Sequence, residues 1–163
     1  MTRTSTSRAA RTSRFWAVPV VVASVAAVAA CSPVLTTKEY SPSDGVRVDL
    51  TADVRGLNLM LVSEGDGAAG TLIGAFANDS TQDVTVGVAP LGGAALEVPV
   101  AGGETVYLGT EEGFEAVLGT VDATPGGVLP VTVTSSTGET ADVELPVLDG
   151  TLPEYEDFLP TAG

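Results

Sequence analysis

Between residues 45 and 148, apolar and polar side chains alternate in short runs, and this period of two constrains the fold more than any other feature. The clearest runs are 46–50, 84–88 and 141–145. Successive side chains of a strand point to opposite faces, so alternation indicates strands that bury one face. No segment carries a convincing helical stripe, and 111–118 offers one or two turns at most. We therefore expect an all-β domain, an antiparallel β-sandwich of about seven to eight strands.

Eight segments rich in Val, Leu and Thr supply the expected strands, with Gly or Pro in the gaps between them. They are 46–50, 57–61, 71–78, 84–88, 96–100, 105–108, 131–134 and 141–145, and the connection between the last two is of the hairpin type. In the second segment, the alternation places Leu57, Leu59 and Leu61 on one face and Asn58 and Met60 on the other.

The first thirty residues have the pattern of a secretory signal peptide. A basic segment rich in Ser and Thr precedes an apolar run at 15–30, and small residues follow. At about 1.5 Å per residue this run reaches only about 24 Å, which is short of a hydrocarbon core of about 30 Å. A cleaved leader is therefore expected over 1–30, rather than a permanent transmembrane helix.

The end of that leader, Val28-Ala29-Ala30-Cys31, resembles the lipobox of bacterial lipoproteins. The resemblance implies a diacylglycerol on the sulfur of Cys31, cleavage just before it, and a cell-membrane location on the extracytoplasmic face. Two or more acyl chains give stable attachment to a bilayer. The membrane is then one expected partner. Residues 31–44, with Pro33 and Pro42, form the lipidated N-terminus and a tether to the domain at 45–148.

The composition excludes several classes of function. The chain has 163 residues, with 7 Lys and Arg, 21 Asp and Glu, one Cys and no His, for a formal net charge of −14. From residue 31 onward, 3 basic residues stand against 21 acidic ones, a formal charge of −18. Such a body is not a nucleic-acid binder, because phosphate contacts need clustered Lys and Arg. Without His, triads and His-ligated zinc are excluded, and we expect neither an enzyme nor a cofactor.

Acidic residues and a methionine are the weak candidates for a metal site. Glu111, Glu112 and Glu115 make the densest acidic cluster of the domain, and carboxylates bind Ca²⁺ when six to eight oxygens converge. The cluster lacks the spacing of a calcium loop, so a solvated loop is expected. Met60 carries a thioether that suits Cu(I), but a single soft ligand does not hold a metal, so a packing role is expected.

Two further motifs are interpreted as turns. The glycines of Gly65-Asp66-Gly67-Ala68-Ala69-Gly70 match a dinucleotide-binding fingerprint, which requires its third glycine to open a helix. Here Gly70 is followed by strand-like residues, so a turn between two strands is expected. Asn78-Asp79-Ser80 matches a glycosylation acceptor and is likewise interpreted as a turn.

Residues 149–163 break the alternation. They contain Pro153, Pro160 and several acids, and we expect an extended, poorly ordered acidic tail. Docking of Tyr155, Phe158 and Leu159 on the body or on a partner is the alternative.

The body from about residue 56 to residue 147 resembles periplasmic copper chaperones of the PCuAC type. The residues that carry the resemblance are strand patterns: 72–78 ending in Asn78 before a polar turn at 79–83, Gly-Glu-Thr-Val at 103–106, and the closing hairpin at 125–133 and 138–147. The resemblance implies a cupredoxin-like or immunoglobulin-like sandwich, in agreement with the alternation.

The copper ligands of that family do not carry over. Its motif needs two His and two Met, with a His-x-Met pair after the Gly-Glu-Thr-Val strand, where Glu115 and Val117 stand here. The region 90–99, where the other pair is expected, holds no ligand. We expect a lipid-anchored, non-catalytic module that binds an unknown envelope protein or ligand. The alternatives are metal handling by acidic residues and an enzyme of unrecognised type.

Overall fold

The computed structural model describes residues 44–65, 67–110 and 112–160, all within the unit Ser41–Gly163. Nine strands are described: β1 Val46–Asp49, β2 Val54–Ser63, β3 Gly70–Asn78, β4 Val84–Pro90, β5 Leu96–Val100, β6 Thr105–Leu108, β7 Val117–Leu118, β8 Val128–Ser135 and β9 Thr140–Leu148. One short helix, α2, spans Pro153–Glu156. The predicted all-β class is confirmed. All eight expected segments form strands, and the two-residue β7 is the one that the alternation misses.

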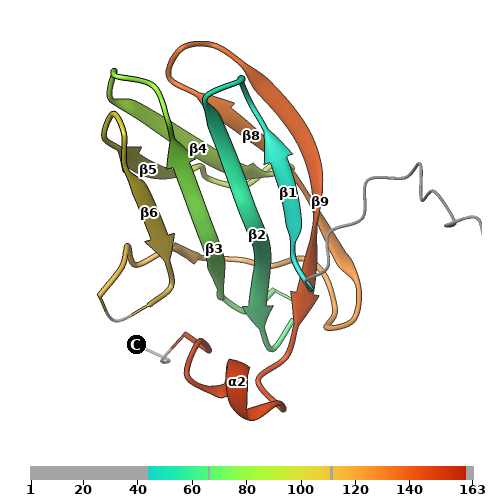
Figure 1. The fold of residues 1–163 in the computed structure, drawn as a ribbon. Coiled ribbons are helices and arrows are strands. Elements are labelled where there is room, and N and C mark those ends of the chain that lie inside the picture. The colour runs from blue at the N-terminus through green and yellow to red at the C-terminus, as the bar shows by residue number, and fades with distance from the viewer. Residues whose placement is uncertain (1–43, 66, 111, 161–163) are drawn as a thin grey trace, which may run out of the picture. The chain divides into compact units, whose positions relative to one another are not determined.

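Two sheets form the sandwich (Figure 1). One contains β1, β2, β3, β6 and β7, and the other runs in the order β5-β4-β8-β9. The β8–β9 pair is the predicted hairpin, with Thr134 opposite Thr140. The sheets join where β9 pairs with the end of β2, through Leu61 opposite Val147. This pair is parallel, so within the described strands the expected antiparallel pattern has one departure.

Aliphatic side chains fill the space between the sheets. The largest fully buried side chains are those of Val and Leu, with a single aromatic ring, Phe76. Each Val or Leu contributes roughly 1.5–3 kcal/mol when it is fully buried, so a core with few aromatic residues is sufficient for a domain of this size. The inward positions of β4 and β8 alternate as predicted, with Val86, Val88, Val131 and Val133 in the core.

A bulge in β2 corrects one expectation about its faces. The register with β3 shifts between Leu57 and Met60, and Asn58 adopts φ 51°, the left-handed region. Val54 faces the core before the bulge, whereas Leu59 and Leu61 face it afterwards, so the inward positions change parity. Leu57 is only half-buried and lies outside the main core. The prediction that it shares a face with Leu59 is wrong, because an extra residue in a strand reverses the alternation.

The tail also differs from the extended segment that the sequence predicted. Over residues 149–160 it turns back toward the ends of β2 and β3 and forms α2 (Figure 1). Tyr155, Phe158 and Leu159 pack on a second apolar cluster made by Met60, Val62 and Ile73. The alternative prediction, that Tyr155, Phe158 and Leu159 dock on the body, is therefore the one that the structure confirms. The physical reason is that the outer face of β2 and β3 is apolar here and is buried by the tail.

Candidate functional site

The loop between β6 and β7 occupies the place where the resemblance to copper chaperones puts metal ligands. It folds back on the end of β6: the amide of Phe114 donates to the carbonyl of Tyr107 at 2.8 Å, and the amide of Gly109 donates to the carbonyl of Phe114 at 2.9 Å. Ala116 is fully buried, and its carbonyl accepts from the amide of Leu72 at 2.8 Å. These backbone hydrogen bonds fix the loop to β6 and β3, and they therefore set the direction of the loop's side chains.

That backbone arrangement sends the acidic side chains outward. Glu112 and Glu115 are both exposed, and Val117 is 37% exposed. Glu111 lies outside the described residues. An open groove of about 400 Å³ runs beside the loop and β6, lined by Thr105, Val106, Tyr107, Thr110, Glu112, Gly113 and Phe114. Of the acidic candidates, Glu112 lines this groove and Glu115 does not.

Met60 lies in a different environment from these carboxylates. It is 3% exposed, on the outer face of β2, among Val62, Ile73 and the side chains of the tail. Its sulfur is therefore packed in an apolar cluster, as expected for a core residue. Among the described residues, no group of three or more His, Cys, Asp or Glu could hold a metal ion. The residues present do not fit the two His and two Met that the copper site of the resembled family requires.

Cys31 and the lipobox residues Val28, Ala29 and Ala30 lie outside the described residues, and lipidation stays a prediction. The part of the chain that the structure describes holds no helix long and apolar enough to cross a membrane.

The two glycine- and asparagine-containing motifs are turns, as expected. Gly65 and Gly67 have φ of 85° and 88°, and Gly70 opens strand β3 rather than a helix, so no phosphate-binding helix N-terminus exists there. Asn78 is fully buried at the end of β3. Its Nδ2 donates to the carbonyl oxygens of Gln82 at 2.7 Å, Val100 at 3.2 Å and Ala101 at 3.2 Å. An amide enclosed in this way is a structural group rather than an accessible acceptor for a glycan.

A second groove, on the other sheet, was not singled out by sequence reasoning. It also measures about 400 Å³ and is lined by Leu91, Pro130, Val131, Thr132, Asp142, Val143 and Glu144. The sequence signals that could have found it are the uncharged loop 91–95 and the alternation of acids with Val in β9. No single segment shows that these elements meet, because β4, β8 and β9 are brought together only by sheet pairing.

Comparison with known proteins supports the fold. No protein-family model and no curated protein matches the sequence. Among solved structures, the chain is similar to a copper-bound PCuAC domain from PmoF2, with a TM-score of 0.54 and 11% sequence identity. The match covers 64% of this chain and 98% of that domain. At this identity the likeness shows a PCuAC-like fold for the body.

Proposed function

We propose that this chain is a lipid-anchored, extracytoplasmic binding module, built on a PCuAC-like sandwich without that family's copper site. The observation that carries the proposal is the contrast between scaffold and ligands. The fold matches that of a copper-bound domain, whereas the corresponding loop presents Glu115 and Val117 and the chain contains no His. A fold alone does not fix a function, because the chemistry depends on the residues of the site.

Anchoring is tested by replacing the sulfur. Cys31→Ser removes the thiol that would be acylated, and we expect loss of labelling by radioactive palmitate and release of the protein from the membrane fraction. Ser32→Ala is the matched control, since it changes a neighbouring hydroxyl and leaves the thiol. If the Cys31→Ser protein stays labelled and membrane-bound, lipid anchoring at this residue is wrong.

Copper handling is the second candidate function, because the similar structure was solved with copper bound. We expect calorimetric titration of the full chain with Cu(I), Cu²⁺ or Ca²⁺ to show no tight one-to-one binding. Met60 is the one thioether beyond the initiator, and it is enclosed by apolar side chains. Tight binding of Cu(I) that Met60→Leu abolishes would replace our proposal with metal handling.

The second groove bears on the enzyme alternative, since Asp142 and Glu144 both line it. Ligand and active sites are typically enclosed pockets, and these two side chains are exposed on an open face. The hydroxyl of Thr132 donates to Asp142 at 2.8 Å, which holds that carboxylate on the outward face of the hairpin. Two exposed acidic side chains on an open face suit recognition of positive charge, so we assign the groove to binding rather than catalysis.

A further inference from the structure

Leu91 is the most exposed large apolar side chain in the described part of the chain, at 94%. It sits at the start of the loop between β4 and β5, where residues 91–95 are all exposed and uncharged. Exposed apolar groups that gather next to a groove commonly mark an interaction site.

The loop presents Leu91 from a fixed turn. The amide of Gly93 donates to the carbonyl of Pro90 at 2.9 Å, and Gly92 between them has φ 76°, which favours glycine. Pro90 is the last residue of β4 and lies opposite Val131 of β8. The side chain of Leu91 is therefore held next to the β8–β9 hairpin before any partner arrives, which lowers the entropy cost of binding.

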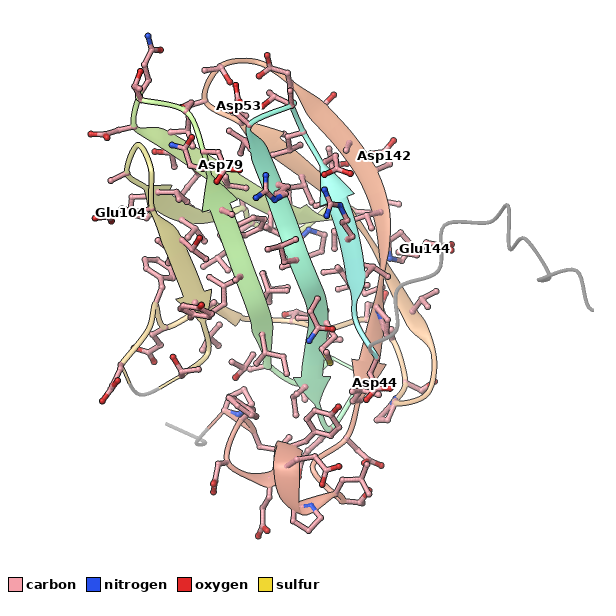
Figure 2. The ribbon with its side chains drawn as sticks, in the orientation of Figure 1. Asp44, Asp53, Asp79, Glu104, Asp142 and Glu144 are labelled. Carbon is pink, nitrogen blue, oxygen red and sulfur yellow. The ribbon has the colours of Figure 1, made fainter. Side chains whose placement is uncertain are left out.

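The groove beside Leu91 has an apolar side and an acidic side. Pro130 lies opposite Glu144, and Thr132 lies opposite Asp142, on the outward face of the hairpin. The lining of the groove contains these two carboxylates and no base. Of the described arginines, Arg47 of β1 forms an ion pair with Asp49, and Arg55 of β2 forms one with Asp79. Figure 2 shows Asp142 and Glu144 along β9, on the opposite side of the domain from Glu104.

We propose that this groove docks a peptide segment of another envelope protein in which a basic residue adjoins an apolar one. Charge complementarity selects this occupant. An anionic lipid surface or a second copy of this acidic chain would bring negative charge against Asp142 and Glu144, and like charges oppose association. A lysine or arginine would meet the two carboxylates while its apolar neighbour covers Leu91 and Pro130. The proposal rests on the binding role proposed above and gives it a partner chemistry.

The experiment is an NMR titration of the isotope-labelled full chain in an uncharged detergent. The probe is a short synthetic peptide that alternates lysine and leucine. Two matched peptides replace either every lysine by glutamate or every leucine by glycine. We expect the lysine–leucine peptide to bind best and to shift resonances of the 91–95 loop, β8 and β9. Tighter binding by the glutamate peptide, or shifts confined to other elements, would overturn the proposal.

Paired variants separate a site from the attraction of bulk charge. Asp142→Asn with Glu144→Gln removes two charges from the groove, and Asp53→Asn with Glu104→Gln removes two exposed charges from the turns before β2 and before β6. We expect the first pair to weaken binding about fivefold and the second less than about twofold. Leu91→Ser should weaken binding about fivefold or more. All these positions are exposed, and thermal unfolding checks that each variant folds.

Equal losses of affinity in the two double variants would show that the overall charge of the domain drives binding. That result would overturn the proposal that the groove is the binding site. The proposal would also be overturned if Leu91 were required for self-association of the chain or for its binding to anionic vesicles. The outcomes stay separable from those for the proposed function. A chain that is lipidated and binds no copper, yet ignores the lysine–leucine peptide, would remove this inference and leave the anchored module in place.

Discussion

The hydroxyl of Tyr155 donates a hydrogen bond of 2.7 Å to the carboxylate of Asp44, across 111 positions of sequence. This contact ties the C-terminal segment to Asp44, two residues before the start of β1. It joins the two ends of the described domain at the end of the sandwich where α2 lies (Figure 1) and where the tail packs on Met60, Val62 and Ile73. The tail is thus held by this hydrogen bond and by the apolar contacts of Tyr155, Phe158 and Leu159. Separate substitutions can test the contribution of each kind of contact.

The Tyr155–Asp44 contact predicts a loss of tail docking at alkaline pH. The hydrogen bond to Asp44 raises the pKa of Tyr155 above its ordinary value, because the ionised phenol would lose the bond and repel the carboxylate. A group whose pKa is raised by folding stabilises the folded state below its ordinary pKa, about 10 for Tyr, and loses that contribution as the pH rises further. We expect the protection of the Leu159 amide, its exchange rate relative to that of an unstructured chain at the same pH, to fall above about pH 10.

Tyr155→Phe should remove this pH dependence at a cost below about 1 kcal/mol, since the pair is open to solvent. Tyr107→Phe is the matched control, because Tyr107 is 63% exposed on the outer side of β6 and distant in sequence from the tail. If protection at Leu159 falls equally with pH in the Tyr155→Phe protein, the hydrogen bond is not what controls docking.

The apolar contacts of the tail protect Met60 from solvent. Phe158→Ala removes a ring that packs on the cluster of Met60, Val62 and Ile73. We expect a loss of about 1–2 kcal/mol in the free energy of unfolding, because the ring is only partly buried. We also expect faster oxidation of Met60 by peroxide, measured by peptide mapping. Leu152→Ala should leave both unchanged, since Leu152 is 50% exposed and lies outside the cluster. Equal oxidation rates in the two variants would show that the tail does not shield the sulfur.

Asn78 should be among the most sensitive positions of the fold. Its Nδ2 serves three carbonyl oxygens, and its Oδ1 accepts from the amide and the hydroxyl of Ser80. Asn78→Ala removes all five of these hydrogen bonds from a fully buried position, which costs about 2–4 kcal/mol. Ser80→Ala removes one of the five bonds and should cost less than about 1 kcal/mol. Chemical denaturation measures both, and similar losses would contradict a central role for the amide.

The bulge at Asn58 predicts an order of substitutions. Its φ of 51° is costly for residues other than Gly and Asn, and its Oδ1 accepts from the amide of Gly45 at 3.0 Å. Asn58→Gly loses only the hydrogen bond, whereas Asn58→Ala also incurs about 1 kcal/mol of backbone strain. We therefore expect Gly to be less destabilising than Ala, and Val to be the worst because it is β-branched. The reverse order in denaturant midpoints would mean that the bulge is not retained in solution.

The charge of the domain predicts a stability that depends on salt. Beyond residue 31 the formal charge is −18, and mutual repulsion of surface carboxylates opposes the compact state. Raising the ionic strength from low to physiological values shortens the screening length, so the melting temperature should rise. The double variant Asp53→Asn with Glu104→Gln should start from a higher melting temperature and respond less to salt. A melting temperature independent of salt would show that this repulsion is negligible.

The alternation of Val with polar residues determined the strands, the aliphatic core and the final hairpin, because the pleat of a strand makes side-chain direction follow sequence position. The same rule failed at Leu57, where a left-handed Asn58 reverses parity, and a bulge depends on partners that the local sequence does not contain.

Only the tertiary structure decided how segments meet. The parallel contact of Leu61 with Val147, the tail over Met60, and the groove that brings Leu91 to Asp142 and Glu144 each join residues far apart in sequence. Local sequence patterns do not show which distant segments come into contact. The hydrophobic effect requires that an apolar face be covered, but it does not specify which segment covers that face.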